Sequence, residues 1–387
     1  MNTSPTIGFL VNPVAGVGGP AGLAGSDGAD VQRRARDRGG EPRAAARAAA
    51  ALAELARHTG VEILTAPAAM GADVVHAQRL PHRTLDVPLP AVTSGTDTTT
   101  CARYLADAAV DLLLFAGGDG TAADVAAGVG HRVPVLGIPA GVKMYSGCFA
   151  VSPQAAGRTA AHYLSRAAGR AMPVEVVDLD EQALREGHAR PRLTASLVVP
   201  IAPAVQQRKA PTEVDLRCQA EQAAWAAAAL VDSDLVTAVG PGGTMAALLA
   251  RRGLPASLLG VDVIDRQGLI AADVSEPQLF EIVTNRPTQI VVTVIGGQGF
   301  LFGRGNQQFS PRVIRAVGAE GIVVVAPELK LAALAGRPLL VDTGDVDTDR
   351  LLTGPRRIIT GVSSWAIYPV GSAADLSRRT ERSGWYS

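Results

Sequence analysis

Short apolar runs alternate with alanine- and leucine-rich stretches from the start of the chain to about residue 150. The apolar runs predict buried β-strands, and the stretches between them predict helices. Predicted strands are Ile7–Val11, Val61–Thr65, Asp111–Ala116 and Val133–Ile138, and predicted helices are Pro42–His58, Ala68–Gln78, a helix capped by Asp97 that ends at Ala108, and Ala122–Ala127. This alternation predicts a parallel sheet with covered faces.

The second half of the chain has a more mixed pattern. A helix begins at Ser152-Pro153 and is predicted to end at about residue 168, and Thr212–Leu230 predicts a long helix. The apolar runs that predict strands are Val174–Leu179, Leu193–Ile201, Leu235–Val239, Leu258–Ile264, Ile290–Ile295, Ile322–Val325, Leu339–Val341 and Ile358–Ile359. We therefore predict an N-terminal α/β domain over residues 1–170 and a β-richer second domain over residues 171–387, whose tail can pack back on the first.

The stretch Leu112–Thr121 ends a buried strand in Gly117-Gly118-Asp119-Gly120-Thr121. Glycines there allow positive φ and a close approach of the backbone, and a helix start directs N–H groups at one point, which suits phosphate. A carboxylate at Asp119 repels phosphate, so it fits a group that accepts a proton from a hydroxyl or helps to hold Mg²⁺. A structural role would be better filled by asparagine or serine, although an Asx-type turn is the plain alternative.

Two more predicted strands also end in glycine-rich segments. Asn12-Pro13 and Gly16-Val17-Gly18-Gly19 follow the first strand, and Pro139-Ala140-Gly141-Val142-Lys143 follows the fourth. Loops at the carboxyl ends of parallel strands are where ligands bind in open α/β sheets. A flexible loop and a surface lysine are the alternatives. The predicted nucleotide- or phosphate-binding residues are Asn12, Pro13, Gly16, Gly18, Gly117, Gly118, Gly120, Thr121 and Lys143.

A second set of candidate residues lies in the second half. Gly240-Pro241-Gly242-Gly243-Thr244 repeats the order strand, glycine turn, threonine and helix, without an aspartate in the turn. Glycines with amide side chains between residues 296 and 308 suggest a loop packed against a polar ligand, or a buried structural loop. Asp262 is a ribose-binding candidate or a core-edge aspartate paired to backbone. The predicted substrate-binding residues are Gly242, Gly243, Thr244, Asp262, Gln298, Arg304 and Asn306.

Composition narrows the class of partner. The chain has 387 residues, enough for two domains, and 47% of them are hydrophobic, so sizeable cores are available. The 36 basic side chains balance 36 acidic ones, which gives no electrostatic signal for nucleic acid or an anionic membrane. Aromatic residues make up 4% of the chain, which argues against a base-stacking surface.

The cysteines and histidines indicate neither a disulfide framework nor a metal site. Cys101, Cys148 and Cys218 lie far apart, which suits a reducing cytoplasm, and Cys148 is predicted to be a small buried thiol. The six histidines are scattered without metal-binding spacing. No targeting segment or apolar stretch of transmembrane length is visible, so we expect a cytoplasmic protein.

The motifs taken together resemble the NAD kinase superfamily, which includes diacylglycerol and sphingosine kinases, and most closely its AcoX-like branch. The resemblance rests on residues 11–16, residues 116–121, residues 137–144, Ile295-Gly296-Gly297-Gln298-Gly299 and residues 303–308. It implies a two-domain fold with an active site in the cleft between the domains. It also implies a homodimer or tetramer that uses ATP and Mg²⁺, with Asp119 as the base that activates the adenosine ribose 2′-hydroxyl of NAD.

Two departures from the kinase pattern concern the substrate. The family's Gly-Ser-Thr-Ala-Tyr stretch is matched by Gly242-Gly243-Thr244-Met245-Ala246 without the tyrosine, and no Asn-Glu pair for the nicotinamide-side ribose is found. The hypotheses are a kinase of NAD or a related nucleotide, a kinase of another small hydroxyl substrate, and a non-catalytic nucleotide sensor. A lipid substrate is disfavoured, because no amphipathic helix is seen. The spacing of Gly16–Ala21 does not fit a dehydrogenase.

Overall fold

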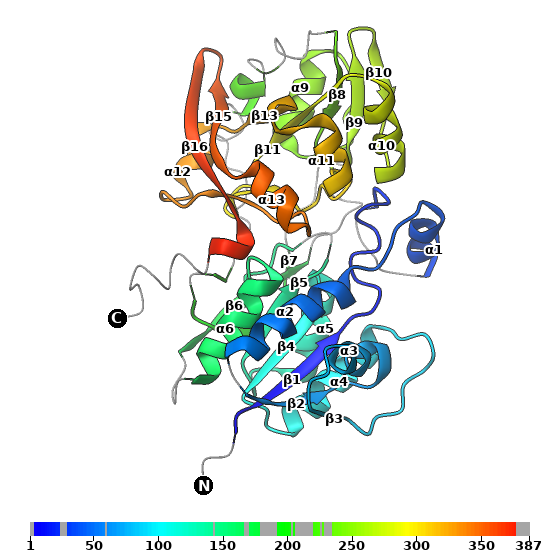
Figure 1. Ribbon diagram of the computed structural model, residues 1–387, viewed down its shortest axis with the longest axis vertical. Helices are drawn as coiled ribbons and strands as arrows, with labels where there is room; N and C mark the ends of the chain where they lie inside the picture. The colour runs from blue at the N-terminus through cyan, green and yellow to red at the C-terminus, as the bar shows by residue number, and fades with distance from the viewer. Residues whose placement is uncertain are drawn as a thin grey trace. The chain divides into compact units, whose positions relative to one another are not determined.

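The computed structural model describes residues 4–23, 29–58, 60–141, 144–165, 170–178, 192–202, 204–205, 220–224, 227 and 234–376. The chain forms two compact units (Figure 1). Unit 1 comprises Met1–Gly16, Pro42–Arg208 and Ala373–Ser387, and unit 2 comprises Val17–Glu41 and Lys209–Ser372.

Unit 1 contains a five-stranded sheet in the order β3-β2-β1-β4-β5. Its strands are β1 (Thr6–Val11), β2 (Glu62–Thr65), β3 (His82–Thr84), β4 (Leu112–Gly117) and β5 (Val135–Pro139). Every pairing is parallel, so the carboxyl ends of β1, β4 and β5 lie at one edge, as the glycine-rich turns predicted. The chain leaves β1 toward β2 and leaves β4 toward β5, so the junction of β1 and β4 is a topological switch point, where such sheets bind ligands.

Helices cover both faces of this sheet. They are α2 (Ala44–His58), η1 (Ala68–Met70), α3 (Ala72–Ala77), α4 (Gly95–Asp107), α5 (Asp119–Val129) and α6 (Pro153–Ser165). Helix α2 packs against α6, and α4 packs against α5 (Figure 1). Right-handed crossovers put these two pairs on opposite faces. Every residue of β4 is consequently buried, which explains its unbroken apolar sequence.

Local packing modifies two of the predicted helices. The predicted helix Ala68–Gln78 is divided at Gly71, where a Cβ atom would lie 2.2 Å from the Thr65 hydroxyl oxygen. The cap of α4 is Ser94 instead of Asp97; the Asp97 carboxylate accepts hydrogen bonds from the Ser94 N–H (2.7 Å) and hydroxyl (2.8 Å), which completes a capping box. Most of the predicted helix Thr212–Leu230 lies outside the described residues.

Unit 1 extends beyond the predicted boundary at residue 170. The strands β6 (Ala171–Asp178) and β7 (Arg192–Pro200) form an antiparallel hairpin within it. The chain also returns to unit 1 at its end, where the Ser152 hydroxyl donates to the Ala373 carbonyl (3.2 Å) and Arg158 donates to the Ala374 carbonyl (2.5 Å). Near the start of the chain, the boundary also differs from the predicted one. The chain passes from unit 1 to unit 2 within the glycine-rich loop after β1, so that Val17–Glu41 belongs to unit 2.

Unit 2 contains a nine-stranded sheet in the order β10-β9-β8-β11-β13-β15-β16-β14-β12. Its strands are β8 (Val236–Val239), β9 (Asp262–Asp265), β10 (Gly268–Ala271), β11 (Thr288–Thr293), β12 (Phe300–Phe302), β13 (Ile322–Val325), β14 (Leu339–Val341), β15 (Gly354–Gly361) and β16 (Ser364–Ser372). The central strands β8, β11, β13 and β15 run parallel. This strand-rich sheet and the parallel α/β sheet of unit 1 together confirm the predicted fold class.

The unit 2 sheet has an apolar core on each face. Ile290 and Val292 of β11 belong to the core that includes residues of α10 and α11, whereas Val291 belongs to the core that includes α9. This alternation follows from the two-residue period of a strand. The helices of this unit are α1 (Ala29–Asp37), α9 (Gly243–Arg251), α10 (Glu276–Asn285), α11 (Pro311–Val317), η2 (Ala319–Gly321), α12 (Glu328–Ala332) and α13 (Val346–Leu352).

Candidate functional site

Asn12 ties the end of β1 to the start of α5 at the switch point of unit 1. Its backbone N–H donates to the Ala116 carbonyl (2.9 Å), and its side-chain amide donates to the Thr121 hydroxyl (2.9 Å). The amide oxygen accepts from the Val14 N–H (3.2 Å), which folds the chain after Asn12 into a turn. The predicted residues Asn12 and Thr121, 109 positions apart, are therefore in direct contact.

The central turn uses a glycine for close packing at Gly117, and its glycines do not adopt positive φ. A Cβ atom on Gly117 would lie 2.4 Å from the Cβ and hydroxyl oxygen of Thr121, so only glycine fits there. Gly118, the N-cap of α5, has φ −122°. Among the described residues, positive φ is found at neither Gly117, Gly118 nor Gly120, so that part of the sequence interpretation is wrong.

Asp119 is the first residue of α5, and its carboxylate is buried among hydrogen-bond donors. One oxygen, Oδ1, accepts from the backbone N–H (3.0 Å) and the hydroxyl (2.5 Å) of Ser146; the other, Oδ2, accepts from the Tyr145 N–H (2.6 Å). A negative side chain in the first turn of a helix is further stabilised by the helix dipole.

These contacts correct the argument that asparagine would fill a structural role at position 119 better. Ser146 and Tyr145 both donate to Asp119, and a carboxylate accepts through both of its oxygens. An asparagine side chain would turn its own N–H₂ group toward a donor. The carboxylate therefore has a structural reason as well as a candidate chemical one.

Helix α2 begins beside the same sheet edge. Gly16 has φ +85°, and a Cβ atom there would lie 2.5 Å from the Ala140 carbonyl oxygen, so the loop after β1 passes close to the end of β5. The Arg43 N–H donates to the Ala15 carbonyl (3.2 Å), and the Arg47 guanidinium donates to the Pro139 carbonyl. Sequence reasoning missed Arg47, because nothing in its helix marks it; Lys143 lies outside the described residues.

The thiol of Cys148 is fully buried near Asp119. Burial, and secondly the negative charge of Asp119, raise the pKa of Cys148 well above its ordinary value. Burial likewise raises the pKa of Cys101 to about 11, with a smaller effect of Asp97. The prediction that Cys148 is a small buried thiol is therefore confirmed. A thiol held in its neutral form is also a poor nucleophile.

In unit 2, a lysine lies against the second glycine turn. Gly242 is the N-cap of α9, and the adjoining Thr244 is buried. The Lys330 ammonium of α12 donates to the hydroxyls of Thr244 (3.3 Å) and Thr293 (3.3 Å) and to the Val294 carbonyl (3.1 Å). It therefore brings a positive charge to the carboxyl ends of β8 and β11. Its separation of 86 residues from Thr244 left no local signal in the sequence.

Two other predicted substrate residues are engaged in the interior of unit 2. Asp262 accepts from the backbone N–H groups of Ser257 (2.6 Å) and Asp273 (3.0 Å), which matches the alternative of an aspartate paired to backbone. The Arg304 guanidinium, 3% exposed, donates to the Asp342 carboxylate (2.8 Å) and lies 4.3 Å from the centre of the Phe300 ring.

The remaining predicted residues of unit 2 shape its loops. Asn306 donates to the Leu301 carbonyl (2.7 Å) and accepts from the Gly303 N–H (3.0 Å), so its amide holds the turn after β12. Gln298 is buried within the preceding turn. The Gly18 carbonyl accepts from the Leu23 N–H (2.8 Å) in the same unit, next to Gly19, which packs against Gln307.

Two family models match this chain. The ATP-NAD kinase N-terminal domain matches residues 7–168, and the ATP-NAD kinase C-terminal domain matches residues 232–370. The chain belongs to the ATP-NAD kinase superfamily. The AcoX-like branch stays a prediction.

The other comparisons add little about this ATP-NAD kinase superfamily member. No protein of curated function matches the chain. A solved structure described as a diacylglycerol kinase from Bacillus anthracis str. Sterne is similar over 47% of this chain, with 16% identity and a TM-score of 0.25. The chain spans 48% of the length of that structure. A similarity at this level carries no argument.

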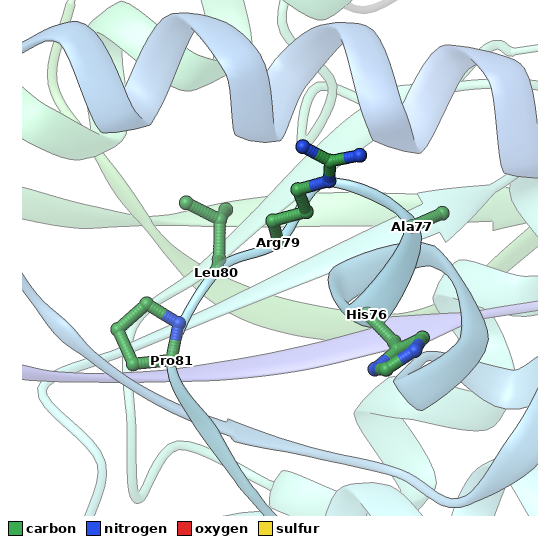
Figure 2. Close-up of a pocket in the computed structure, with 5 residues that line it drawn as sticks. All are labelled: His76, Ala77, Arg79, Leu80 and Pro81. Atoms are coloured by element: carbon green, nitrogen blue, oxygen red, sulfur yellow. The ribbon is translucent and has the colours of Figure 1, made fainter.

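A surface hollow of about 740 Å³ lies away from the switch point. It is lined by His76, Ala77, Arg79, Leu80 and Pro81, which follow one another along a single short segment (Figure 2). This segment directly precedes β3, so it lies at the amino ends of the strands, opposite the edge that carries Asn12 and the central turn. The hollow therefore contains none of the candidate residues.

The described parts of the chain offer no ready-made metal cage. Within them, no group of three or more histidine, cysteine, aspartate or glutamate side chains could hold a metal ion. A separate observation concerns membranes: none of the helices in the described ranges combines the length and apolar character needed to span a bilayer.

Proposed function

We propose that this ATP-NAD kinase superfamily member transfers a phosphoryl group from ATP to a hydroxyl of a nucleotide or dinucleotide, with the 2′-hydroxyl of NAD as the leading acceptor. The observation that carries the proposal is the position of Asp119. It begins α5 beside the switch point of the unit 1 sheet, where the ends of β1 and β4 are joined by Asn12. Phosphoryl transfer requires positioned phosphates and a group that orients the attacking hydroxyl.

The phosphate-binding part of the proposal rests on backbone donors at this edge. The loop after β1, up to Gly16, and the turn Gly117–Thr121 supply N–H groups near the start of α5, and Arg47 supplies a positive charge near the end of β5. Gly18, also predicted to bind nucleotide, belongs to unit 2. Lys143 lies outside the described residues and is still proposed to bind phosphate.

Asp119 is proposed to orient the attacking hydroxyl. Its carboxylate is held at the start of α5 by hydrogen bonds from Ser146 and Tyr145. A substrate hydroxyl that donates its hydrogen to this fixed carboxylate would have its oxygen lone pair directed at phosphorus. We therefore propose that Asp119 orients the attacking hydroxyl and does not fully abstract its proton.

Mg²⁺ is expected to come with ATP. Magnesium usually keeps several waters and binds through one or two carboxylates together with substrate phosphates. The surroundings of Asp119 do not form a closed set of ligands, because its two oxygens are occupied by Ser146 and Tyr145 donors.

The acceptor is proposed to be anionic, because of Lys330. Its ammonium lies at the glycine turn that corresponds to the family's substrate stretch, and an ammonium favours a phosphate-bearing acceptor such as NAD. The lack of the family's tyrosine leaves a phosphorylated or carboxylated small hydroxyl compound as the second candidate acceptor.

The test is a phosphotransferase assay on a panel of acceptors. Wild-type protein with ATP and Mg²⁺ is offered NAD, NADH, nucleosides and small hydroxyl acids, and products are identified by mass spectrometry. NADP formation is the expected result. Thermal shifts are measured in parallel, since a ligand at one hundred times its Kd stabilises the folded protein by about 2.7 kcal/mol.

A separate experiment tests the ATP site. Gly118→Val should weaken ATP binding in calorimetry, and unchanged affinity in the folded variant would contradict the proposed ATP site.

One observation favours a second candidate function, a non-catalytic nucleotide sensor. The donors from Ser146 and Tyr145 give the Asp119 carboxylate a structural role that needs no substrate. Under this alternative, ATP or NAD shifts the melting temperature while no acceptor in the panel gains a phosphoryl group. Turnover of any acceptor at enzymatic rates excludes the sensor.

A further inference from the structure

Ser146 is a fully buried serine, and its hydroxyl joins Asp119 to the β6–β7 hairpin. The hydroxyl lies 2.5 Å from Asp119 Oδ1 and 3.4 Å from the Val177 carbonyl oxygen, and it accepts from the Val177 N–H at 3.1 Å. A hydroxyl has a single hydrogen to donate. The distances assign that hydrogen to Asp119, because 2.5 Å is within the range of a strong O–H···O⁻ bond and 3.4 Å is not.

The Val177 N–H sets the direction of the Ser146 hydroxyl. This N–H belongs to β6, a different element from the loop that carries Ser146, and it occupies a lone pair of the hydroxyl oxygen. The hydroxyl hydrogen is then turned toward Asp119. As a result, the carboxylate is held by two donors from Ser146 at Oδ1 and by the Tyr145 N–H at Oδ2, which fixes the rotation of its plane.

We propose that Ser146 is a positioning residue for phosphoryl transfer: its hydroxyl, set by the Val177 N–H, holds the Asp119 carboxylate in the orientation that receives the substrate hydroxyl. This inference rests on the proposed function. Precise orientation is worth much of an enzyme's rate, and a misplacement of about 1 Å can cost about a hundredfold. The role differs from binding, because Ser146 acts through Asp119 and is itself shielded from ligand.

The experiment compares variants of Ser146 with a matched serine in the same unit. Ser146→Ala removes the hydroxyl, and Ser146→Cys keeps a similar volume with a weaker donor. The control is Ser152→Ala: Ser152 is also buried, and its hydroxyl donates to the Ala373 carbonyl (3.2 Å) and accepts from the Ala155 N–H (3.1 Å). All variants are checked for folding by circular dichroism and for melting temperature.

We expect kcat to fall about 10- to 100-fold in Ser146→Ala, with KM for ATP and acceptor within about twofold of wild type. Ser146→Cys should be intermediate, and Ser152→Ala should keep the wild-type kcat even where its melting temperature falls as far. If Ser146 had a merely structural role, Ser146→Ala and Ser152→Ala would both lower the melting temperature. Neither variant would then lower kcat selectively at unchanged KM.

The outcomes separate the inference from the proposed function. The inference is overturned, while the kinase function stands, if wild-type protein turns over an acceptor and folded Ser146→Ala keeps its kcat. A rise in KM at unchanged kcat overturns the inference in the same way. If wild-type protein turns over nothing in the panel, the proposed function is overturned. A double-mutant cycle of Ser146→Ala and Asp119→Asn in urea unfolding then measures the coupling free energy between the two side chains. Additive effects would show that Ser146 and Asp119 are not coupled, which would overturn the inference as well.

Discussion

The two glycine turns have the same local design and opposite charges. In both, a buried parallel strand ends in glycines and a threonine lies in the first turn of the helix that follows. The turn at Gly117–Thr121 carries a carboxylate, Asp119, within the motif, whereas the turn at Gly240–Thr244 receives an ammonium from Lys330, 86 residues further along the chain. The repeated motif thus supplies the backbone geometry, and its chemistry depends on which charged group is brought to it.

This contrast also separates two kinds of role. Asp119 is surrounded by donors, so it is suited to accept a hydrogen bond from a neutral hydroxyl. Lys330 is a donor at a helix start, and both features favour an anion. The contrast therefore predicts that substitutions at the first turn lower kcat. Substitutions at the second turn should raise KM for a charged acceptor.

The largest expected effect is that of Asp119→Asn. Loss of the carboxylate should lower kcat by about 10²- to 10⁴-fold, the usual contribution of such a group. It should also destabilise the fold by about 1–3 kcal/mol, because the new amide N–H₂ faces the Ser146 or Tyr145 donors. Steady-state rates at saturating ATP and urea unfolding measure the two effects.

A matched control for Asp119→Asn exists in unit 2. The buried Asp349 carboxylate accepts from the N–H (2.9 Å) and the hydroxyl (2.7 Å) of a single residue, Thr343, much as Asp119 does from Ser146. Asp349→Asn should lose comparable stability and keep its kcat. A normal kcat in Asp119→Asn would contradict the role of Asp119, and equal losses in both variants would assign the effect to stability alone.

The next effect concerns Lys330. Replacing it with glutamine removes a charge-assisted donor, and we expect KM for a phosphate-bearing acceptor to rise about tenfold, with kcat changed much less. Lys330→Arg, which keeps the charge, should be closer to wild type. Initial rates at varied acceptor concentration provide the measurement, and a lower kcat at unchanged KM would remove the distinction between the two turns.

A smaller effect separates the glycines of the two turns. Gly117→Ala should destabilise by about 1–3 kcal/mol, because its Cβ atom would lie 2.4 Å from Thr121 atoms that belong to the core of the turn. Gly243→Ala, at the first position of α9, meets no atom within 4 Å and should be neutral or slightly stabilising. Urea unfolding compares the two, and equal destabilisation would mean that steric space does not distinguish them.

The sequence predicts the framework of the candidate site well, for a physical reason. A strand buried on both faces is continuously apolar, so β1, β4 and β5 are visible as runs, and each ends where glycine or proline breaks the pattern. Parallel strands share one carboxyl edge, which already implies that Asn12 and Thr121 lie close together. The location of the catalytic candidate follows from these local patterns.

The partners of the candidate residues were not predictable, because they come from segments without a motif. Ser146 lies 27 residues after Asp119, and Asp342 lies 38 residues after Arg304. Arg304, a predicted substrate-binding residue, has its guanidinium paired with Asp342 in the interior of unit 2. The predicted roles of the binding residues, the homo-oligomer and the cytoplasmic location stay predictions.

The last comparison concerns stability alone, as a pH dependence that distinguishes unit 1. Its helices α2 and α6 are joined by a buried ion pair, Glu54 with Arg158 (2.8 Å). Burial raises the pKa of Glu54, but hydrogen bonds from Arg158 and His58 and the charges of Arg158 and Arg57 outweigh it, so this pKa lies below its ordinary value of 4.5. A carboxyl group with a lowered pKa contributes stability above its unfolded pKa and loses it as pH falls through the folded one.

The stability difference between wild type and Glu54→Gln should therefore be largest near neutral pH and shrink as pH falls below about 4.5. Near neutral pH the variant leaves the Arg158 guanidinium buried without its carboxylate, a change that costs about 3–5 kcal/mol at buried pairs. Asp345→Asn in unit 2 is the comparison, because hydrogen bonds from Thr348 lower the pKa of the half-buried Asp345 to about 2. Urea unfolding from pH 7 to pH 3 measures both. A constant Glu54 difference across that range would mean that Glu54 titrates alike in the folded and unfolded chain, and its buried pair would then add nothing to the acid sensitivity of unit 1.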